Sequence, residues 1–164
     1  MKVVITNGVA RSGKDTVARM LSERMKVIKL SSIDGVKDLA REIGWDGTKD
    51  ERNRKFLSDL KMLLSEYNDY PFEYLKRKVS ECPEDATVLV DIREPEEIAK
   101  AVDYFNAITI LVRRDSVKQV TSNFGDAHVY EYAYQYCINN NGTLDELETE
   151  VDKLAAFITA WEGK

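Results

Sequence analysis

The sequence is poor in the residues on which many catalytic and structural chemistries depend. It has one histidine, His128, and two cysteines, Cys82 and Cys137, whose spacing matches neither a metal-ligand pattern nor a disulfide framework. We therefore assign His128 no catalytic role and expect two buried thiols in a reducing, cytoplasmic location. No uninterrupted apolar run approaches membrane-spanning length, so we expect no membrane partner.

Positive charge is also in deficit. The chain carries 24 Lys and Arg against 29 Asp and Glu, a net charge of -5, which argues against a nucleic-acid polymer as the partner. A small anionic ligand would need only a local basic pocket. With 164 residues, 43% of them hydrophobic, and no internal repeat, the chain is long enough for one domain with a real core.

What the sequence does contain is a glycine-rich segment near its start. Residues 2–6 have a β-type sequence, Gly8 and Gly13 follow five residues apart, and a helical pattern begins at Lys14. Strand, glycine loop and helix in this order are the context of a phosphate-binding P-loop. Glycines let backbone N–H groups wrap a phosphate chain, and the positive end of the helix faces the same anion. An ordinary glycine turn is the poorer interpretation, because spacing, lysine and flanking elements all agree.

One position in this segment departs from the usual pattern. The residues that we expect to contact the phosphates of a nucleotide are Gly8, Arg11, Ser12, Gly13, Lys14, Asp15 and Thr16. A Ser or Thr normally follows the lysine directly and holds magnesium, whereas here Asp15 has this place and Thr16 comes next. A carboxylate suits magnesium but is also favoured as a helix cap. The sequence leaves both roles for Asp15 open.

Strands and helices alternate along the chain, which predicts an α/β fold. After residues 2–6, we expect strands at 26–30, 87–91, 107–112 and 135–138. The prediction is a three-layer P-loop NTPase fold, with a parallel five-stranded sheet flanked by helices. Residues 34–80 form a helical insertion between the second and third strands of a single domain, 1–164.

Local signals predict how several helices begin, end and pack. Asp34 should be the N-cap of a helix that runs through Ile43, with Gly44 as its C-cap. Thr143 to Glu146 has the pattern of a capping box at the start of the last helix. A helix within the insertion should bury one stripe of residues, namely Phe56, Leu60, Leu63, Leu64 and Tyr67.

Charged residues follow the end of the third predicted strand. Asp91 ends the strand beside the P-loop, which is where the ligands of a magnesium ion are held, and Arg93 would lie at the same rim. The alternative is that Asp91 caps the next helix while Arg93 pairs with Glu96 or Glu97. Either arrangement is compatible with the sequence.

Four more arginines are candidates for phosphate contacts. Arg113 and Arg114 follow the strand at 107–112 and could clamp a phosphate, or they could be ordinary surface charges. Arg52 and Arg54 lie at a loop-to-helix junction in the insertion, where most basic residues have acidic neighbours. We take these two as the better candidates within the insertion.

Three segments match motifs of a known family. Gly8 to Thr16 ends in Arg-Ser-Gly-Lys-Asp-Thr, and Val90 to Glu97 is similar to an Asp-x-Arg-x-Pro-x-Glu segment. Ile138 to Leu147 resembles the final strand and turn of the same proteins and of dephospho-coenzyme A kinases. The chain thus resembles nucleoside-monophosphate-kinase-like P-loop proteins, and most closely the phage-type deoxynucleoside monophosphate kinases. Animal-type phosphomevalonate kinase has a similar Ser-Gly-Lys-Asp loop.

The resemblance implies an ATP- and Mg²⁺-dependent kinase that converts a (deoxy)nucleoside monophosphate to the diphosphate. The implied catalytic residues are Lys14, Arg93, Arg113 and Arg114. The implied acceptor ligands are Arg93, Arg52 and Arg54, and the implied magnesium ligands are Asp15 or Thr16 together with Asp91. The acceptor phosphate is already ionised, so no general base is required.

The same resemblance sets the expected partners and alternatives. We expect small-molecule nucleotides as partners, with a homodimer left open, the insertion 34–80 as the acceptor-binding part and 113–131 as a lid-like region. One alternative is a kinase for another phosphorylated acceptor, such as phosphomevalonate or dephospho-coenzyme A. The other is a nucleotide-binding module without turnover.

Overall fold

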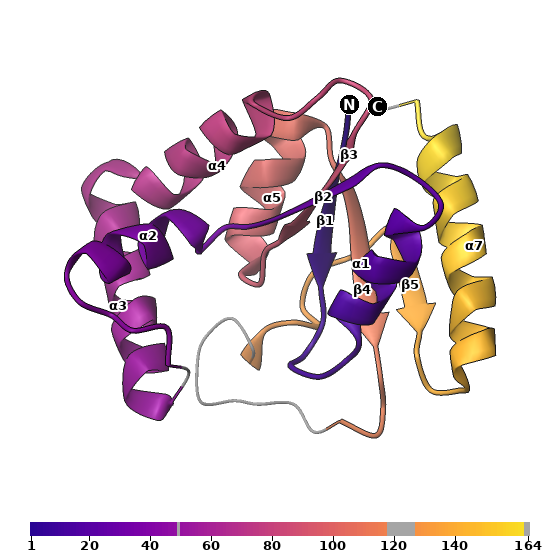
Figure 1. Cartoon of the computed structure of the whole chain (residues 1–164), viewed down its shortest axis with the longest axis horizontal. Helices are drawn as coiled ribbons and strands as arrows, with labels where there is room; N and C mark the ends of the chain where they lie inside the picture. Colours follow the sequence, from indigo (N-terminus) through magenta and orange to yellow (C-terminus); the bar gives the residue numbers. More distant parts are fainter. Residues whose placement is uncertain (49, 118–126, 163–164) are drawn as a thin grey trace. The chain divides into compact units, whose positions relative to one another are not determined.

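The computed structural model describes the whole chain except residues 49, 118–126 and 163–164 (Figure 1). Its strands are β1 (Lys2–Asn7), β2 (Val27–Ser31), β3 (Thr87–Asp91), β4 (Ile108–Arg113) and β5 (Tyr136–Asn139). Its helices are α1 (Lys14–Ser22), α2 (Asp34–Glu42), α3 (Glu51–Asn68), α4 (Tyr70–Ser80), α5 (Pro95–Phe105) and α7 (Leu144–Ala160). Nine of the nineteen residues of the predicted lid-like region at 113–131, namely 118–126, lie outside the described residues.

The strands form one sheet in the order β2-β3-β1-β4-β5. β1 pairs in parallel with β3 on one side and with β4 on the other, and β4 pairs in parallel with β5. The apolar run in β1 is therefore explained by its central place, because such a strand is covered on both faces. The predicted α/β fold, with a parallel five-stranded sheet and a helical insertion between β2 and β3, is confirmed.

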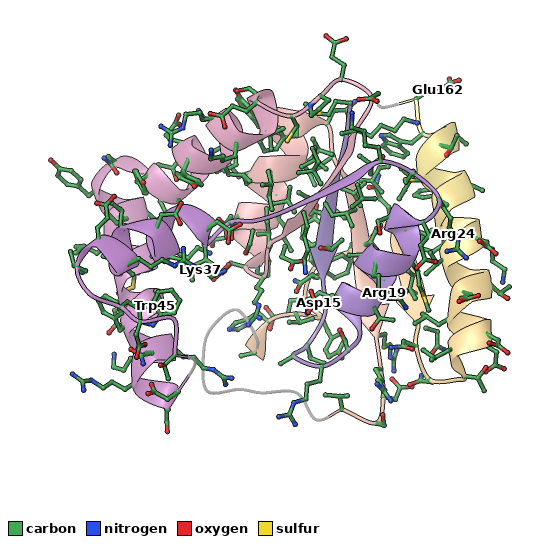
Figure 2. The ribbon with its side chains drawn as sticks, viewed as in Figure 1. Asp15, Arg19, Arg24, Lys37, Trp45 and Glu162 are labelled. Atoms are coloured by element: carbon green, nitrogen blue, oxygen red, sulfur yellow. The ribbon has the colours of Figure 1, made fainter. Side chains whose placement is uncertain are left out.

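The chain divides into two compact units. The first comprises Met1–Lys29 and Pro83–Lys164, and the second comprises Leu30–Cys82. In the first, α1 and α7 pack over one face of the sheet and bury the side chains of Val4, Leu21 and Leu154. Arg24, just after α1, pairs with Asp152 of α7 at 2.5 Å (Figure 2). These contacts hold the C-terminal part of α1 against α7 and the sheet.

The last helix is capped at both ends. Thr143 and Glu146 form the predicted capping box, in which each side chain accepts a hydrogen bond from the backbone of the other. At the other end, the Lys2 ammonium donates to the carbonyl oxygens of Ile158 and Thr159, both at 2.6 Å. A cation is favourable at a helix C-terminus, where the carbonyl groups of the last turn lack backbone partners.

The second unit contains α2, α3 and α4, and residues of α2 and α3 form a small apolar cluster. Val36, Ala40 and Leu57 are its buried members. Gly44 follows α2 with a positive φ of 101°, but the C-cap is Ile43 and not Gly44 as predicted, and Asp34 is not the N-cap. The N-cap is Ile33, because the chain is already helical there, and the Asp34 carboxylate instead accepts from the Ser31 N–H at 2.8 Å.

Two predictions about burial are wrong. In α3, Leu63 and Tyr67 are exposed, at 61% and 82%, while Leu57, outside the predicted stripe, is buried. Apolar residues occur on several faces of this helix, so their spacing alone does not select the buried face. Neither cysteine is fully buried: Cys82 is partly exposed, and Cys137 is exposed on β5, which is an edge strand.

None of the helices in the described part of the chain combines the length and the apolar character that crossing a membrane requires.

Candidate functional site

The loop between β1 and α1 has the backbone of an anion-binding turn. Gly8 and Gly13 have φ values of 151° and 103°, and Arg11 also lies in the left-handed region, with a φ of 68°. The Ser12 N–H donates to the Val9 carbonyl at 3.1 Å, which closes the loop on itself. Gly13 is the N-cap of α1 and supplies no side chain to the first turn. The amide groups that begin α1 therefore have no N-cap side chain competing for them.

Both glycines are also required by close contacts. A Cβ atom at Gly8 would lie 2.5 Å from the Val112 carbonyl oxygen, and one at Gly13 would overlap the side-chain nitrogen of Asn140. That Asn140 nitrogen donates to the Ser12 carbonyl at 2.8 Å. Asn140, in the turn after β5, thus holds the loop at Ser12, and the loop packs at Gly8 against Val112 of β4.

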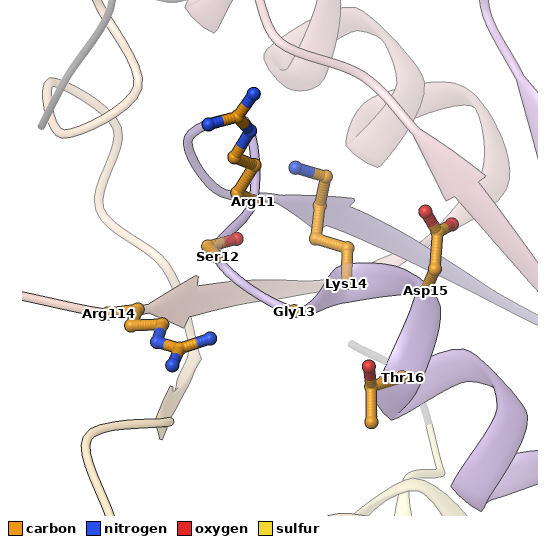
Figure 3. Close-up of a pocket in the computed structure, with 7 residues that line it drawn as sticks. All are labelled: Arg11, Ser12, Gly13, Lys14, Asp15, Thr16 and Arg114. Carbon is orange, nitrogen blue, oxygen red and sulfur yellow. The ribbon is translucent and has the colours of Figure 1, made fainter. Parts of the chain in front are cut away.

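A cavity of about 280 Å³ opens beside this loop (Figure 3). Its lining consists of Arg11, Ser12, Gly13, Lys14, Asp15, Thr16 and Arg114. Six of these are predicted phosphate contacts, and the seventh is one of the two arginines predicted after β4. Three cations and one carboxylate line the cavity, so its formal charge favours an anion.

Two groups in the cavity wall are suited to a phosphate. The Lys14 ammonium donates to the carbonyl oxygens of Gly8 and Val9, so it lies over the loop itself. The Ser12 hydroxyl oxygen is buried and has no hydrogen-bond partner among the described residues. A buried polar group without a partner is costly, and an anion bound in the loop would offer it one.

Asp91 lies where the sequence predicted, at the carboxyl end of β3. Its Oδ1 accepts a hydrogen bond of 2.5 Å from the Thr6 hydroxyl of neighbouring β1. The alternative, that Asp91 caps the next helix, is not borne out, because α5 begins at Pro95 with Glu94 as its N-cap. Asp15 is likewise not the N-cap of α1, since Gly13 has that position.

A lysine that the sequence did not single out joins these two carboxylates. The Lys29 ammonium of β2 pairs with Asp15 and lies 3.3 Å from Oδ2 of Asp91. Partial burial acts to lower the pKa of Lys29, but the hydrogen bond to Asp15 and the charge of Asp91 outweigh it and raise the pKa above its ordinary value. Lys29 therefore stays charged between the two carboxylates.

These carboxylates suit a magnesium ion. Mg²⁺ is usually held by one or two protein carboxylates together with phosphate oxygens and water. The shared contact with Lys29 shows that oxygens of Asp15 and Asp91 face one positively charged group. Within the described ranges, no cluster of three or more histidine, cysteine, aspartate or glutamate side chains could hold a metal alone. An ion held by these two carboxylates would complete its shell with water or with phosphate oxygens.

A buried asparagine, also missed, connects the loop to the segment after β3. Asn7 is fully buried; its Oδ1 accepts from the Gly8 N–H at 2.8 Å, and its Nδ2 donates to the Arg93 carbonyl at 3.1 Å. Nδ2 also lies 2.7 Å from the Tyr134 hydroxyl, and burial raises the pKa of Tyr134 to about 12. A polar residue ending a buried strand just before the first glycine was the available signal.

The predicted arginines fall in different places. Arg114 lines the cavity, whereas the Arg113 guanidinium pairs with Asp115 at 2.6 Å and is not among the lining residues. Arg93 is exposed on the segment between β3 and α5. Arg52 and Arg54 belong to the second unit, in the first turn of α3, where Arg52 is exposed and Arg54 is exposed as well.

Together, a glycine loop after the central strand and a parallel five-stranded sheet flanked by helices define an α/β fold that solved structures share. TT1252 from Thermus thermophilus has a similar crystal structure, with a TM-score of 0.57 and 19% identity over 95% of this chain and 97% of that one. Shikimate kinase from Bacteroides thetaiotaomicron gives 0.51 and 13%, over 96% and 98% of the two chains. Thymidylate kinase from Candida albicans gives 0.52 and 13%, over 96% and 92%.

No family model and no curated protein sequence matches the chain. The similarity to solved structures, at these identities, shows the fold. The predicted resemblance to P-loop kinases is thus confirmed at the level of fold, while the closer resemblance to phage-type deoxynucleoside monophosphate kinases stays a prediction.

Proposed function

We propose that the protein is a kinase that transfers the terminal phosphoryl group of ATP to a (deoxy)nucleoside monophosphate, forming the diphosphate. The observation that carries this proposal is the cavity lined by Arg114 and by six consecutive residues, Arg11 to Thr16, from the loop and the first turn of α1. Two of the proteins with the same fold are by name kinases of small substrates, which supports the reaction class. The motif at Val90 to Glu97 favours a nucleotide acceptor through its resemblance to phage-type kinases.

In this proposal the loop amides and Lys14 hold the ATP phosphates, with Gly8 allowing the backbone to approach them. Asp15 and Asp91 hold magnesium, with Thr16 as the alternative to Asp15. The ion, when bound, neutralises charge on the phosphates. An oxygen of the acceptor phosphate attacks the terminal phosphorus, the bond to the bridging oxygen breaks, and ADP leaves. No proton needs to be removed, so the chain's task is positioning and charge neutralisation.

The arginines complete the proposed site. Arg93 would bind the acceptor phosphate, because its backbone is tied through Asn7 to the start of the loop. Arg114 is favoured over Arg113 for neutralising the moving phosphoryl group, because it lines the cavity while Arg113 is paired with Asp115. Arg52 and Arg54 would contact the acceptor from the insertion.

By the same resemblance, the insertion at 34–80 would close over the acceptor and exclude water that would otherwise hydrolyse ATP. We place the protein in the cytoplasm, where ATP is available. A homodimer stays an open prediction.

A panel of acceptors tests this function directly. Purified protein is incubated with ATP, Mg²⁺ and, in separate reactions, each (deoxy)nucleoside monophosphate, phosphomevalonate or dephospho-coenzyme A, and ADP release is recorded. We expect stimulation by at least one nucleoside monophosphate. Stimulation only by phosphomevalonate or dephospho-coenzyme A would show a kinase for another phosphorylated acceptor. ATP binding without stimulation by any acceptor would favour a nucleotide-binding module without turnover.

Two variants locate the reaction in the proposed site. Lys14→Ala should lower turnover by about 10² or more while the circular dichroism spectrum stays unchanged. Lys153→Ala, on the surface of α7, is the control and should retain full activity. Arg93→Ala should raise the acceptor KM about tenfold or more and leave ATP binding unchanged. Normal turnover by Lys14→Ala would reject the P-loop assignment.

A further inference from the structure

Lys29 occupies a position that connects three elements of the first unit. It lies on β2, the edge strand next to β3, and its ammonium contacts Asp15 in the first turn of α1 and Asp91 at the end of β3. The side chain is 38% exposed, so it is accessible to solvent while paired. Its ammonium thus contacts both of the carboxylates that we assign to magnesium.

The contacts of Asp91 show which oxygen is available to a cation. Oδ1 accepts from the Thr6 hydroxyl, and Oδ2 faces the Lys29 ammonium at 3.3 Å. A metal held by Oδ2 of Asp91 together with the Asp15 carboxylate would therefore lie close to the Lys29 ammonium, which contacts both carboxylates. Like charges repel, so an ammonium and a divalent cation cannot both lie against these oxygens without a large electrostatic cost.

We infer that Lys29 is a displaceable counter-cation for the Asp15–Asp91 pair. Without metal, its ammonium offsets the repulsion between the two carboxylates; when a divalent cation binds, the ammonium moves away from them. The inference rests on the metal site of the proposed function and adds a residue that tunes the affinity of that site. It predicts the direction of one effect: removing the Lys29 ammonium should increase the affinity of the site for a divalent cation.

The test measures metal binding to the nucleotide-free protein. Mn²⁺ is titrated into wild type and Lys29→Met, and free Mn²⁺ is followed by electron paramagnetic resonance. We expect Lys29→Met to bind Mn²⁺ about fivefold more tightly or better, the lower range of coupling between two bound species. Lys26→Met is the matched control: Lys26 lies just before β2, pairs with Asp85 at 2.7 Å and should leave Mn²⁺ affinity unchanged when replaced. Asp91→Asn should weaken binding.

Unchanged or weaker Mn²⁺ binding by a folded Lys29→Met would overturn the inference, since it would mean that Lys29 is irrelevant to the metal or helps to hold it. If that variant does not fold, a measurement on the wild-type protein still tests whether Lys29 is displaced. On Mg²⁺ titration, the ¹³Cε signal of Lys29 should shift while that of Lys26 does not, and a static Lys29 signal contradicts displacement. Neither experiment contains ATP or acceptor, so a failure here is distinguishable from absence of kinase activity.

Discussion

At the scale of single residues, the site depends on backbone conformations that only glycine adopts at low cost. Gly13 combines a φ of 103° with close contact to Asn140, whose side chain holds the Ser12 carbonyl. Gly47, in the second unit, has a similar φ of 89°, but no atom lies within 4 Å of the place that a Cβ atom would take there. Comparing substitutions at Gly13 and Gly47 therefore separates the effect of a positive φ from the effect of a close contact with Asn140.

We predict that Gly13→Ala and Gly47→Ala each lose about 1–2 kcal/mol of stability from the left-handed conformation, measured by urea unfolding. Only Gly13→Ala should also weaken ATP binding, measured by calorimetry, because the added methyl group displaces Asn140 and with it the Ser12 carbonyl. Equal ATP affinity in the two variants would show that Asn140 does not support the loop.

Single residues also show what the sequence could reveal. The loop residues and Asp91 were found because their positions follow from strand, glycine and helix signals along one segment. Lys29 and Asn7 were missed, because their roles depend on neighbouring strands that only the folded sheet brings together. Arg113 and Arg114 were indistinguishable in sequence, and the ion pair with Asp115 separates them.

At the scale of elements, α7 shows how a packing helix is fixed. Its buried face covers the sheet, its N-terminus has the capping box, and the Lys2 ammonium contacts its last carbonyls. The box was readable because it is local, spanning Thr143 to Glu146. The contact with Lys2 was not, because 156 residues separate the ammonium from the Ile158 carbonyl along the chain.

Removing the capping hydroxyl gives a prediction for this element. Thr143→Ala should lower the free energy of unfolding by about 1 kcal/mol, because the Glu146 N–H loses its acceptor. Thr149→Ala is the comparison: its hydroxyl bonds only to the Asp145 carbonyl within the helix, so the change should be smaller. Guanidinium unfolding measures both. An identical loss in the two variants would deny the capping box any special contribution.

At the scale of the whole molecule, the two units have separate buried clusters. Leu154 belongs to the cluster beneath α1 and α7, and Leu57 belongs to the cluster of the second unit. The parallel sheet and the insertion were predictable because alternating strands and helices constrain topology. The packing of the second unit was not, because Leu63 and Tyr67 show that its helices also expose large apolar side chains.

Truncating a buried side chain in each cluster should therefore reduce hydrogen-exchange protection in different parts of the chain. Leu57→Ala should reduce hydrogen-exchange protection mainly in α2–α4 and leave the amides of β1 and β4 protected. Leu154→Ala should cost about 2–5 kcal/mol and reduce protection across the sheet. If Leu57→Ala lowered protection uniformly along the chain, the two units would share one cooperative core.

The central claim is that backbone amides between β1 and α1 hold the phosphates of ATP. The most direct measurement is a titration of ¹⁵N-labelled protein with ATP and Mg²⁺, followed through the amide chemical shifts. We predict that the largest shifts fall on residues 8–16 and that Lys14→Ala strongly reduces them. Shifts concentrated elsewhere, or none at millimolar ATP, would contradict the claim.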